Sequence, residues 1–250
     1  MIKKFFLLIS IILFTSCSNN NNNCKSQSVD SNNKTVSTSN ENKPIKITDG
    51  EKKEIEESYE YKKLVMEGLS DEDKNILENC IETKDKGVYH YITYTMDTNE
   101  LIDDTIYGVD ENYEFSIKSD GYSSLTDGKT ATFVDTNKNL YYQSEVTGQE
   151  SQYTKEIKAL SGYYEIYGQE LKEIIHDDNY ITLIYKNGCY DKYDKKNFDL
   201  VESIFYGQEY KLVQKLEDKQ DDVKASYDKY IKVIDGMKKA STVGEVTGNE

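Results

Sequence analysis

The sequence has no tryptophan and, among its 31 basic residues, no arginine, so every basic residue is a lysine. No contact of this protein can therefore use the planar, bidentate guanidinium group. With 46 acidic residues, the chain carries a net charge of −15. A field of that sign repels nucleic acid and anionic lipid headgroups, which excludes a nucleic-acid partner. Solubility is the simpler alternative explanation of the acidity.

Residues that usually perform catalysis are also scarce. The two histidines are His90, on an apolar strand face typical of a core residue, and His176, in a predicted loop. No H-E-x-x-H, paired C-x-x-C, G-x-S-x-G or phosphate-loop motif occurs. The neighbouring acids Asp103–Asp104 and Asp177–Asp178 lack the spacing of a calcium loop, and in a strand they would point to opposite faces. We therefore predict that the protein is not an enzyme and has neither cofactor nor metal.

The first residues form an export signal. Two lysines precede an apolar run of ten residues, Phe5–Phe14, which is too short to span a bilayer. The small residues Thr15 and Ser16 then precede Cys17, which resembles the lipobox of bacterial lipoproteins, although Phe14 departs from the usual leucine. This resemblance implies removal of residues 1–16 and lipid attachment at Cys17. An ordinary secretory signal followed by an unrelated cysteine is the alternative.

Residues 17–48 have the composition of a tether. They are almost wholly Asn, Ser, Lys, Thr and Gln, and they contain the one proline, Pro44. Such a segment cannot bury enough apolar surface to fold, so we predict a disordered spacer behind the lipid anchor. Acyl chains on Cys17 would hold the protein at the extracytoplasmic face of the cell membrane, with membrane lipid as its first partner. After removal of residues 1–16, the chain has 29 lysines and 46 acidic residues, which give a net charge of −17.

Three further cysteines remain. Cys24 lies in the tether, and Cys80 and Cys189 lie in the folded part. Outside the cytoplasm a disulfide between Cys80 and Cys189 is one alternative, and two buried free thiols are the other.

The predicted domain covers residues 49–240 and is followed by a disordered tail at 241–250. Residues 49–84 have helical periodicity and break at 68–70, where Ser70 and Asp73 have the spacing of a capping box. Two more helical stretches are predicted, at 154–174 and 212–239. The chain also has 22 tyrosines, whose apolar rings with one polar end suit a half-solvated sheet.

From Gly87 onward, the apolar period changes from helical to the period of two that indicates strands. Asp127-Gly128 and Asn187-Gly188 are typical of type I′ hairpins. They predict that Tyr122–Thr126 pairs with the strand at 129–134, and that Ile181–Tyr185 pairs with Cys189–Tyr193. About eight or nine strands with short connections predict an α+β fold, in which a curved antiparallel meander has its helices packed on one face.

Several stretches resemble a known family. "GVYHYITYT", "TATFVDTNKNLYYQSEVTG" and "ITLIYKNGCYDKYDKKNFDLVESIFYGQEYKL" are similar in their strand and turn punctuation to lipoprotein-carrier half-barrels of the LolA/LppX type, over roughly residues 87–212. The resemblance implies a half-barrel with an apolar concavity. Some members carry acyl chains, and the GerS-type germination lipoproteins of anaerobic spore formers are non-catalytic partners of a cortex amidase. The Asn-, Lys- and Ile-rich composition fits this second group, but the lack of arginine departs from it.

Two functions follow from this resemblance. The first is a membrane-anchored lipoprotein that binds and supports a protein of the cell envelope or of spore germination, such as a peptidoglycan hydrolase. The alternative is a carrier of lipid or another apolar ligand in the half-barrel. Helices filling the sheet face of Tyr113, Phe115 and Ile117 would favour the first, and an open apolar cavity would favour the second.

Overall fold

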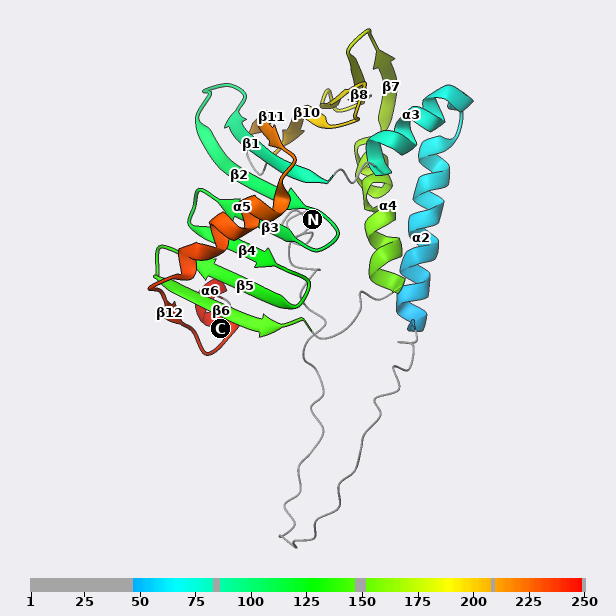
Figure 1. Ribbon diagram of the computed structural model, residues 1–250. Helices are drawn as coiled ribbons and strands as arrows, with labels where there is room; N and C mark the ends of the chain where they lie inside the picture. Colours follow the sequence, from blue (N-terminus) through cyan, green and yellow to red (C-terminus); the bar gives the residue numbers. More distant parts are fainter. Residues whose placement is uncertain (1–46, 83–85, 147–151, 208–209, 249–250) are drawn as a thin grey trace, which may run out of the picture. The chain divides into compact units, whose positions relative to one another are not determined.

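The computed structural model describes residues 47–82, 86–146, 152–207 and 210–248 (Figure 1). These residues form an α+β domain of helices and a mostly antiparallel sheet. The helices are α2 (Asp49–Met66), α3 (Asp71–Glu82), α4 (Gln152–Gln169), α5 (Val223–Tyr230) with the 3₁₀ turn η1 (Ile231–Ile234), and α6 (Val243–Thr247). The strands are β1 (Gly87–Thr95), β2 (Leu101–Val109), β3 (Glu114–Lys118), β4 (Tyr122–Thr126), β5 (Thr130–Asp135), β6 (Leu140–Glu145), β7 (Leu171–His176), β8 (Tyr180–Tyr185), β9 (Tyr190–Asp194), β10 (Leu200–Tyr206), β11 (Lys211–Gln220) and β12 (Lys238–Lys239).

The two N-terminal helices begin where their capping residues predict. Thr48 caps α2 in a complete capping box with Glu51. At the start of α3, the backbone N–H of Asp73 donates to Ser70 Oγ at 3.1 Å, and the Ser70 hydroxyl donates to the Asp73 carboxylate at 2.7 Å. These caps satisfy backbone groups that a helix start leaves unpaired. The predicted break at 68–70 is confirmed.

The sheet contains twelve strands in the order β12-β6-β5-β4-β3-β2-β1-β11-β10-β9-β8-β7. Two meanders, β1–β6 and β7–β11, meet where β1 pairs with β11. All pairs are antiparallel except β12 with β6. The predicted antiparallel α+β fold is confirmed, but the expected eight or nine strands are too few, and the sheet is not strongly curled.

Both predicted hairpins form, but with a different turn. β4 pairs with β5 and β8 pairs with β9. Within the two dipeptides 127–128 and 187–188, only the glycines have positive φ, Gly128 at +76° and Gly188 at +77°. A type I′ turn centred on such a dipeptide would require positive φ at both of its residues. The Asp127 carboxylate instead accepts hydrogen bonds from the N–H groups of residues 129 and 130. These bonds stabilise the β4–β5 turn although Asp127 does not have positive φ.

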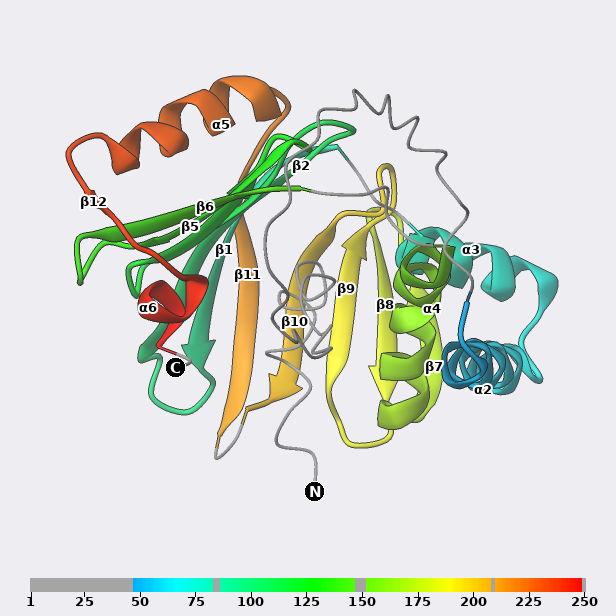
Figure 2. The ribbon, with the colours of Figure 1, turned by 90° about the horizontal axis from the view of Figure 1, so that it is seen from below.

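The helices lie on both faces of the sheet, so the prediction of helices on one face is wrong. Directly paired residues point to the same face, and Val88, Gly108, Phe115 and Leu125 form one such row. Helix α5 covers this row, whereas α6 lies on the opposite side of the sheet (Figure 2). The other row, running from Leu183 through Asp191, Ser203 and Gln214 to Thr93, belongs to the face that α3 and α4 cover at β8 and β9.

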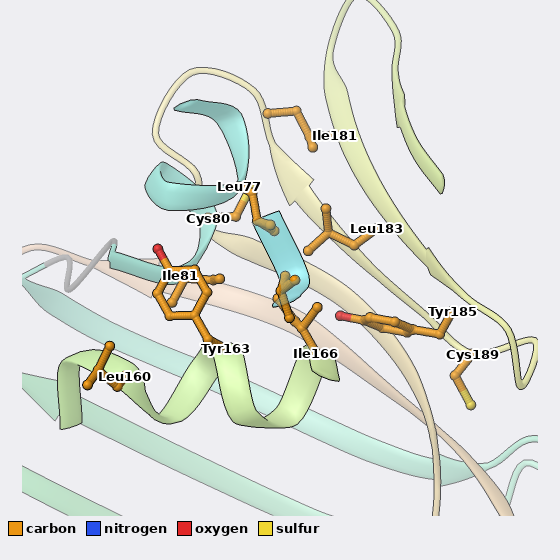
Figure 3. Packing of buried hydrophobic residues seen from close by; sticks show 11 residues of the cluster. Leu77, Cys80, Ile81, Leu160, Tyr163, Ile166, Ile181, Leu183, Tyr185 and Cys189 are labelled. Carbon is orange, nitrogen blue, oxygen red and sulfur yellow. The ribbon is translucent and has the colours of Figure 1, made fainter. Parts of the chain in front are cut away.

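Two separate hydrophobic cores result. The first joins Val65 of α2 and the inner sides of α3 and α4 to Ile181, Leu183 and Tyr185 of β8 (Figure 3). The second joins α5 to β1, β3, β4 and β5. The apolar side of the sheet therefore changes face between β1–β5 and β8, and each half needs its own covering helices.

Three segments differ from their predicted structure. Residues 171–176 and 211–220 are the strands β7 and β11, not helix. β11 pairs on both sides, with β1 and β10, and these ladder bonds satisfy its backbone at the centre of the sheet. The predicted disordered tail contains α6, whose Val246 is fully buried. Within the described ranges, no helix is long and apolar enough to cross a membrane.

Candidate functional site

Helices α2 and α4 form a parallel pair that presents aromatic side chains. Near their starts, the Tyr153 hydroxyl donates to Glu54 Oε2 at 2.6 Å. Further along, the Tyr61 ring lies 5.3 Å from the Tyr164 ring and 4.8 Å from the Tyr167 ring, between centroids. Because early residues contact early residues and late ones contact late ones, the two helices run in the same direction.

Helix α4 divides its apolar residues between two sides. Leu160, Tyr163 and Ile166 are buried and point into the first core (Figure 3). Tyr164 and Tyr167 follow the buried residues by one position each and are therefore rotated outward, where they are 42% and 41% exposed. The helix thus has one side fixed by the core and a second side that carries half-exposed tyrosine rings.

We call the outward residues Tyr61, Leu64, Tyr164 and Tyr167 the tyrosine surface. Leu64, which is 44% exposed, lies one turn beyond Tyr61 on α2. The ring contacts between Tyr61 and its two neighbours hold the rings in fixed positions, so little further side-chain entropy is lost on binding. Such an apolar patch with hydroxyl edges has the composition of a protein-interface core.

The surroundings of the tyrosine surface are acidic. Helix α2 contains six acidic residues and four lysines in its eighteen residues. Three of these lysines form ion pairs within α2: Lys52 with Asp49, Lys53 with Glu57 and Lys63 with Glu60. Together with the overall negative charge, this leaves a rim that favours a basic partner surface.

The sheet face named in the carrier hypothesis is filled. Tyr113 contacts Tyr227 of α5 with ring centroids 4.9 Å apart, and Phe115 contacts Tyr230 at 5.6 Å. Phe115 is 1% exposed, and Ile117 packs against the same core. On this face, α5 occupies the space that an acyl chain would need.

A cavity of about 310 Å³ lies beside α5, over β1, β2 and β11. Its wall is mostly polar and includes His90, Asp218, Asp222, Ser226 and Lys229. This lining is unlike that of an apolar ligand pocket, in which hydrophobic side chains predominate.

The predicted lipid-attachment residue, Cys17, lies outside the described residues. Cys80 and Cys189 are both buried and both free, so the disulfide alternative is not formed in the structure. Cys80 lies beside Leu77 on α3, whereas Cys189 lies beside Tyr185 next to the β8–β9 turn (Figure 3). Burial raises the pKa of the Cys80 thiol to about 12 and also raises the pKa of Cys189, which makes both thiols poor nucleophiles.

The histidines and acid pairs have structural partners. His90 is half-buried, and its Nε2 lies 2.7 Å from Asp104 Oδ1. Asp103 accepts from the Thr105 hydroxyl at 2.7 Å and points to the other face, as predicted for neighbours in a strand. Asp177 accepts the N–H groups of Asn179 and Tyr180, which lowers its pKa. His176 lies 3.8 Å from Asp73.

The tyrosine surface was not predicted from the sequence. The 22 tyrosines and the helical stretch predicted at 154–174 do not indicate which rings point outward. Their spacing of three, displaced by one from Leu160, Tyr163 and Ile166, is the signal that could have shown an outward aromatic stripe.

No protein-family profile matches the chain. No curated protein matches it. Among solved structures, the chain is similar to a LolA superfamily protein from Nitrosomonas europaea, with 12% identity and a TM-score of 0.25. The similarity covers 59% of this chain and 92% of that one.

Proposed function

We propose that this protein is a non-enzymatic, extracytoplasmic lipoprotein that is anchored through Cys17 and binds another protein of the cell envelope. The observation that carries the proposal is the tyrosine surface on α2 and α4. Neighbouring residues of the same two helices, Val65 and Tyr163, are buried in the first core, whereas Leu64, Tyr164 and Tyr167 are 41–44% exposed. The polar spacer expected at 17–48 would let this surface reach a partner while the lipid keeps the protein at the membrane.

The physical case rests on what exposed tyrosines contribute to binding. A tyrosine side chain offers a large apolar area with only two side-chain torsions, and it is enriched among residues that dominate binding energy. The four residues of the tyrosine surface span two helices, so a partner would contact a rigid platform. Acidic residues around it would steer a basic partner and exclude an acidic one.

The partner class follows from the family resemblance. A supporting lipoprotein of the GerS type suggests a protein of the envelope or of spore germination, such as a peptidoglycan hydrolase. Identifying the captured protein by mass spectrometry tests this part separately. A partner without any link to the cell wall would overturn the hydrolase assignment and leave the binding function intact.

Site-specific cross-linking tests the surface. A photo-reactive phenylalanine is placed at Tyr164 or Tyr167 in the full chain, and at Tyr206 as a control. Tyr206 is 56% exposed but lies on the sheet, away from α2 and α4. We expect one discrete cross-linked product from positions 164 and 167 in living cells and none from 206. Equal products at all three positions, or none at 164 and 167, would contradict the proposal.

The second candidate is an apolar-ligand carrier. It is favoured only by the resemblance to half-barrel carriers, since α5 fills the face of Phe115. Native mass spectrometry of the purified protein separates the two functions. A stoichiometric non-covalent lipid that survives desalting would support the carrier, whereas the mass of the polypeptide with its covalent Cys17 lipid alone would support the protein-binding role.

A further inference from the structure

The cavity beside α5 has the features of a small-molecule site. One side of α5 lines it, through residues spaced by three and four: Asp222, Ala225, Ser226, Lys229 and Tyr230. The other wall consists of Val88 and His90 of β1, Ile106 of β2, and Asp218 and Gln220 of β11. Its volume of about 310 Å³ lies at the lower end of the range for ligand pockets, roughly 300–1,000 Å³. It suits a ligand of monosaccharide size.

Several polar groups at this cavity retain unused hydrogen-bonding capacity. Asp218 accepts from the Gln220 amide at 3.0 Å through Oδ2, and Asp222 accepts from the Ala225 N–H through Oδ1. The second oxygen of each carboxylate has no partner among the described residues. Nor do the Ser226 and Tyr230 hydroxyls have a hydrogen bond within those ranges. These four residues line one cavity, at which Asp218 and Asp222 are exposed to solvent, and their hydroxyls and carboxylates match a ligand with several hydroxyl groups.

The charge at the cavity favours a cation. Asp218 and Asp222 face it, Asp104 stands behind His90 at 2.7 Å, and Lys229 is the one ammonium group in its wall. Within the described part of the chain, no group of three His, Cys, Asp or Glu side chains could hold a metal ion. An organic cation, which needs no close coordination shell, fits these carboxylates better.

We propose that this cavity binds a small, hydroxyl-rich molecule that carries a protonated amine, which is the chemistry of an amino sugar. The amine lies against the carboxylates of Asp218 and Asp222. The ring hydroxyls exchange hydrogen bonds with Ser226, Tyr230 and the free nitrogen of His90. Binding here is separate from the tyrosine surface, because the cavity and that surface are built on different helices and different cores.

Three probes test the ligand class by isothermal titration of the purified full-length protein at low salt and slightly acidic pH. Glucosamine carries both the amine and the hydroxyls, glucose lacks the amine, and ethanolamine lacks the ring. We expect saturable, millimolar binding of glucosamine and at least about tenfold weaker binding of the other two. If glucose binds as tightly as glucosamine, the carboxylates do not recognise the amine. If ethanolamine binds as tightly as glucosamine, the hydroxyl groups of the ring are not recognised. Either result, or no binding of glucosamine, overturns the proposal.

Two variants locate the site. Asp218→Asn keeps an acceptor for Gln220 and removes one charge, and Ser226→Ala removes a free hydroxyl from a helix that tolerates alanine. Each should weaken glucosamine binding at least about fivefold without changing the thermal midpoint of the free protein. Asp221→Asn is the matched control, since Asp221 is exposed and does not line the cavity. Undiminished binding in both site variants, or an equal loss in the control, would show that glucosamine binds elsewhere.

Discussion

Lys219 and Asp199 form an ion pair that joins β11 to the loop between β9 and β10, and its carboxylate is buried. Lys219 Nζ donates to Asp199 Oδ2 at 2.6 Å, and the Asp199 side chain is only 4% exposed. The Asn197 amide and the Tyr89 hydroxyl donate to the same carboxylate. The charge on Asp199 is thus compensated by three donors from separate parts of the fold.

Removing one partner should therefore cost much more than removing a surface ion pair. We predict that Lys219→Met lowers the free energy of unfolding by about 3–5 kcal/mol, because it leaves a buried carboxylate without its counter-charge. Chemical denaturation monitored by tyrosine fluorescence measures this loss. The control is Lys186→Ala, which breaks the exposed pair with Glu170 at 3.1 Å. It should cost less than about 1 kcal/mol. Similar losses in the two variants would refute the compensation argument.

We predict that the Asp191 carboxyl contributes to the pH dependence of the free energy of unfolding. This half-buried carboxylate faces the first core, and desolvation raises its pKa although the Ser203 and Tyr185 hydroxyls donate to it. A carboxyl whose pKa is higher in the folded state binds more protons there than in the unfolded chain. Its contribution therefore favours folding at low pH and is lost as pH rises through the raised pKa.

Asp191→Asn should remove that contribution. We expect the variant to gain stability relative to wild type as pH rises from about 4 towards neutrality, over the window between the ordinary aspartate value and the raised one. Urea titrations at several pH values give the difference. Desolvation, and next the charge on Asp191, raise the pKa of Glu165. The pKa of Glu165 should therefore be lower in the variant than in the wild type. A wild-type-minus-variant difference that does not change with pH would contradict this account.

Local signals in the sequence predicted local structure well. Ser70 and the glycines of the two hairpins act on neighbouring backbone groups, so their effect can be predicted without knowledge of the fold. Leu212, Val213 and Leu216 have the spacing of a helix, and the helix predicted from them is wrong, because they lie in β11. Pairing with β1 and β10 decided the outcome, and these partners lie far away in the sequence.

The candidate sites were harder to predict for a related reason. Whether a tyrosine points outward depends on which side of its helix the core occupies, as Tyr163 and Tyr164 show by their opposite burial. The change of apolar face between β1–β5 and β8 cannot be detected strand by strand, because each strand alternates in the same way. Asp199 gives no local signal at all, since its counter-charge comes from Lys219, twenty residues away.

Gly108 and Phe115 predict a steric effect in the second core. The two residues are paired across β2 and β3, and a Cβ at position 108 would lie 2.2 Å from Phe115 Cζ. We expect Gly108→Ala to cost roughly 1–3 kcal/mol, because the 1% exposed ring has no space to move into. Thermal unfolding measures the loss.

A double variant shows whether the ring is the cause. Phe115→Ala alone should cost about 3–5 kcal/mol, and adding Gly108→Ala to it should cost little more. Gly50→Ala on α2, where a Cβ meets nothing within 4 Å, should not destabilise the protein. Fully additive losses at positions 108 and 115 would place the strain elsewhere.

The lipid anchor predicts where the protein is found. Cys17→Ala removes the thiol to which the lipid would be attached, so we expect the protein to move from the membrane fraction to the soluble extracytoplasmic fraction. Cell fractionation and metabolic labelling with palmitate measure both parts of the claim. Cys24→Ala is the matched control, and it should leave the protein labelled and bound to membranes. Retention of Cys17→Ala in the membrane, or no label in the wild type, would refute lipidation.

The buried thiols predict a slow chemical reaction. A thiol reacts as its thiolate, and burial raises the pKa of Cys80 to about 12 and also raises that of Cys189. Both side chains also pack within the first core, 6% and 1% exposed, so an alkylating reagent reaches them only when that core opens. We expect peptide mapping after iodoacetamide treatment to find both residues unmodified in the native protein and fully modified in denaturant.

Leu77→Ala, which enlarges the core beside Cys80, should speed the labelling of Cys80 more than that of Cys189. Rapid labelling of the native wild type, or a Cys80–Cys189 cross-linked peptide, would contradict the packing described here.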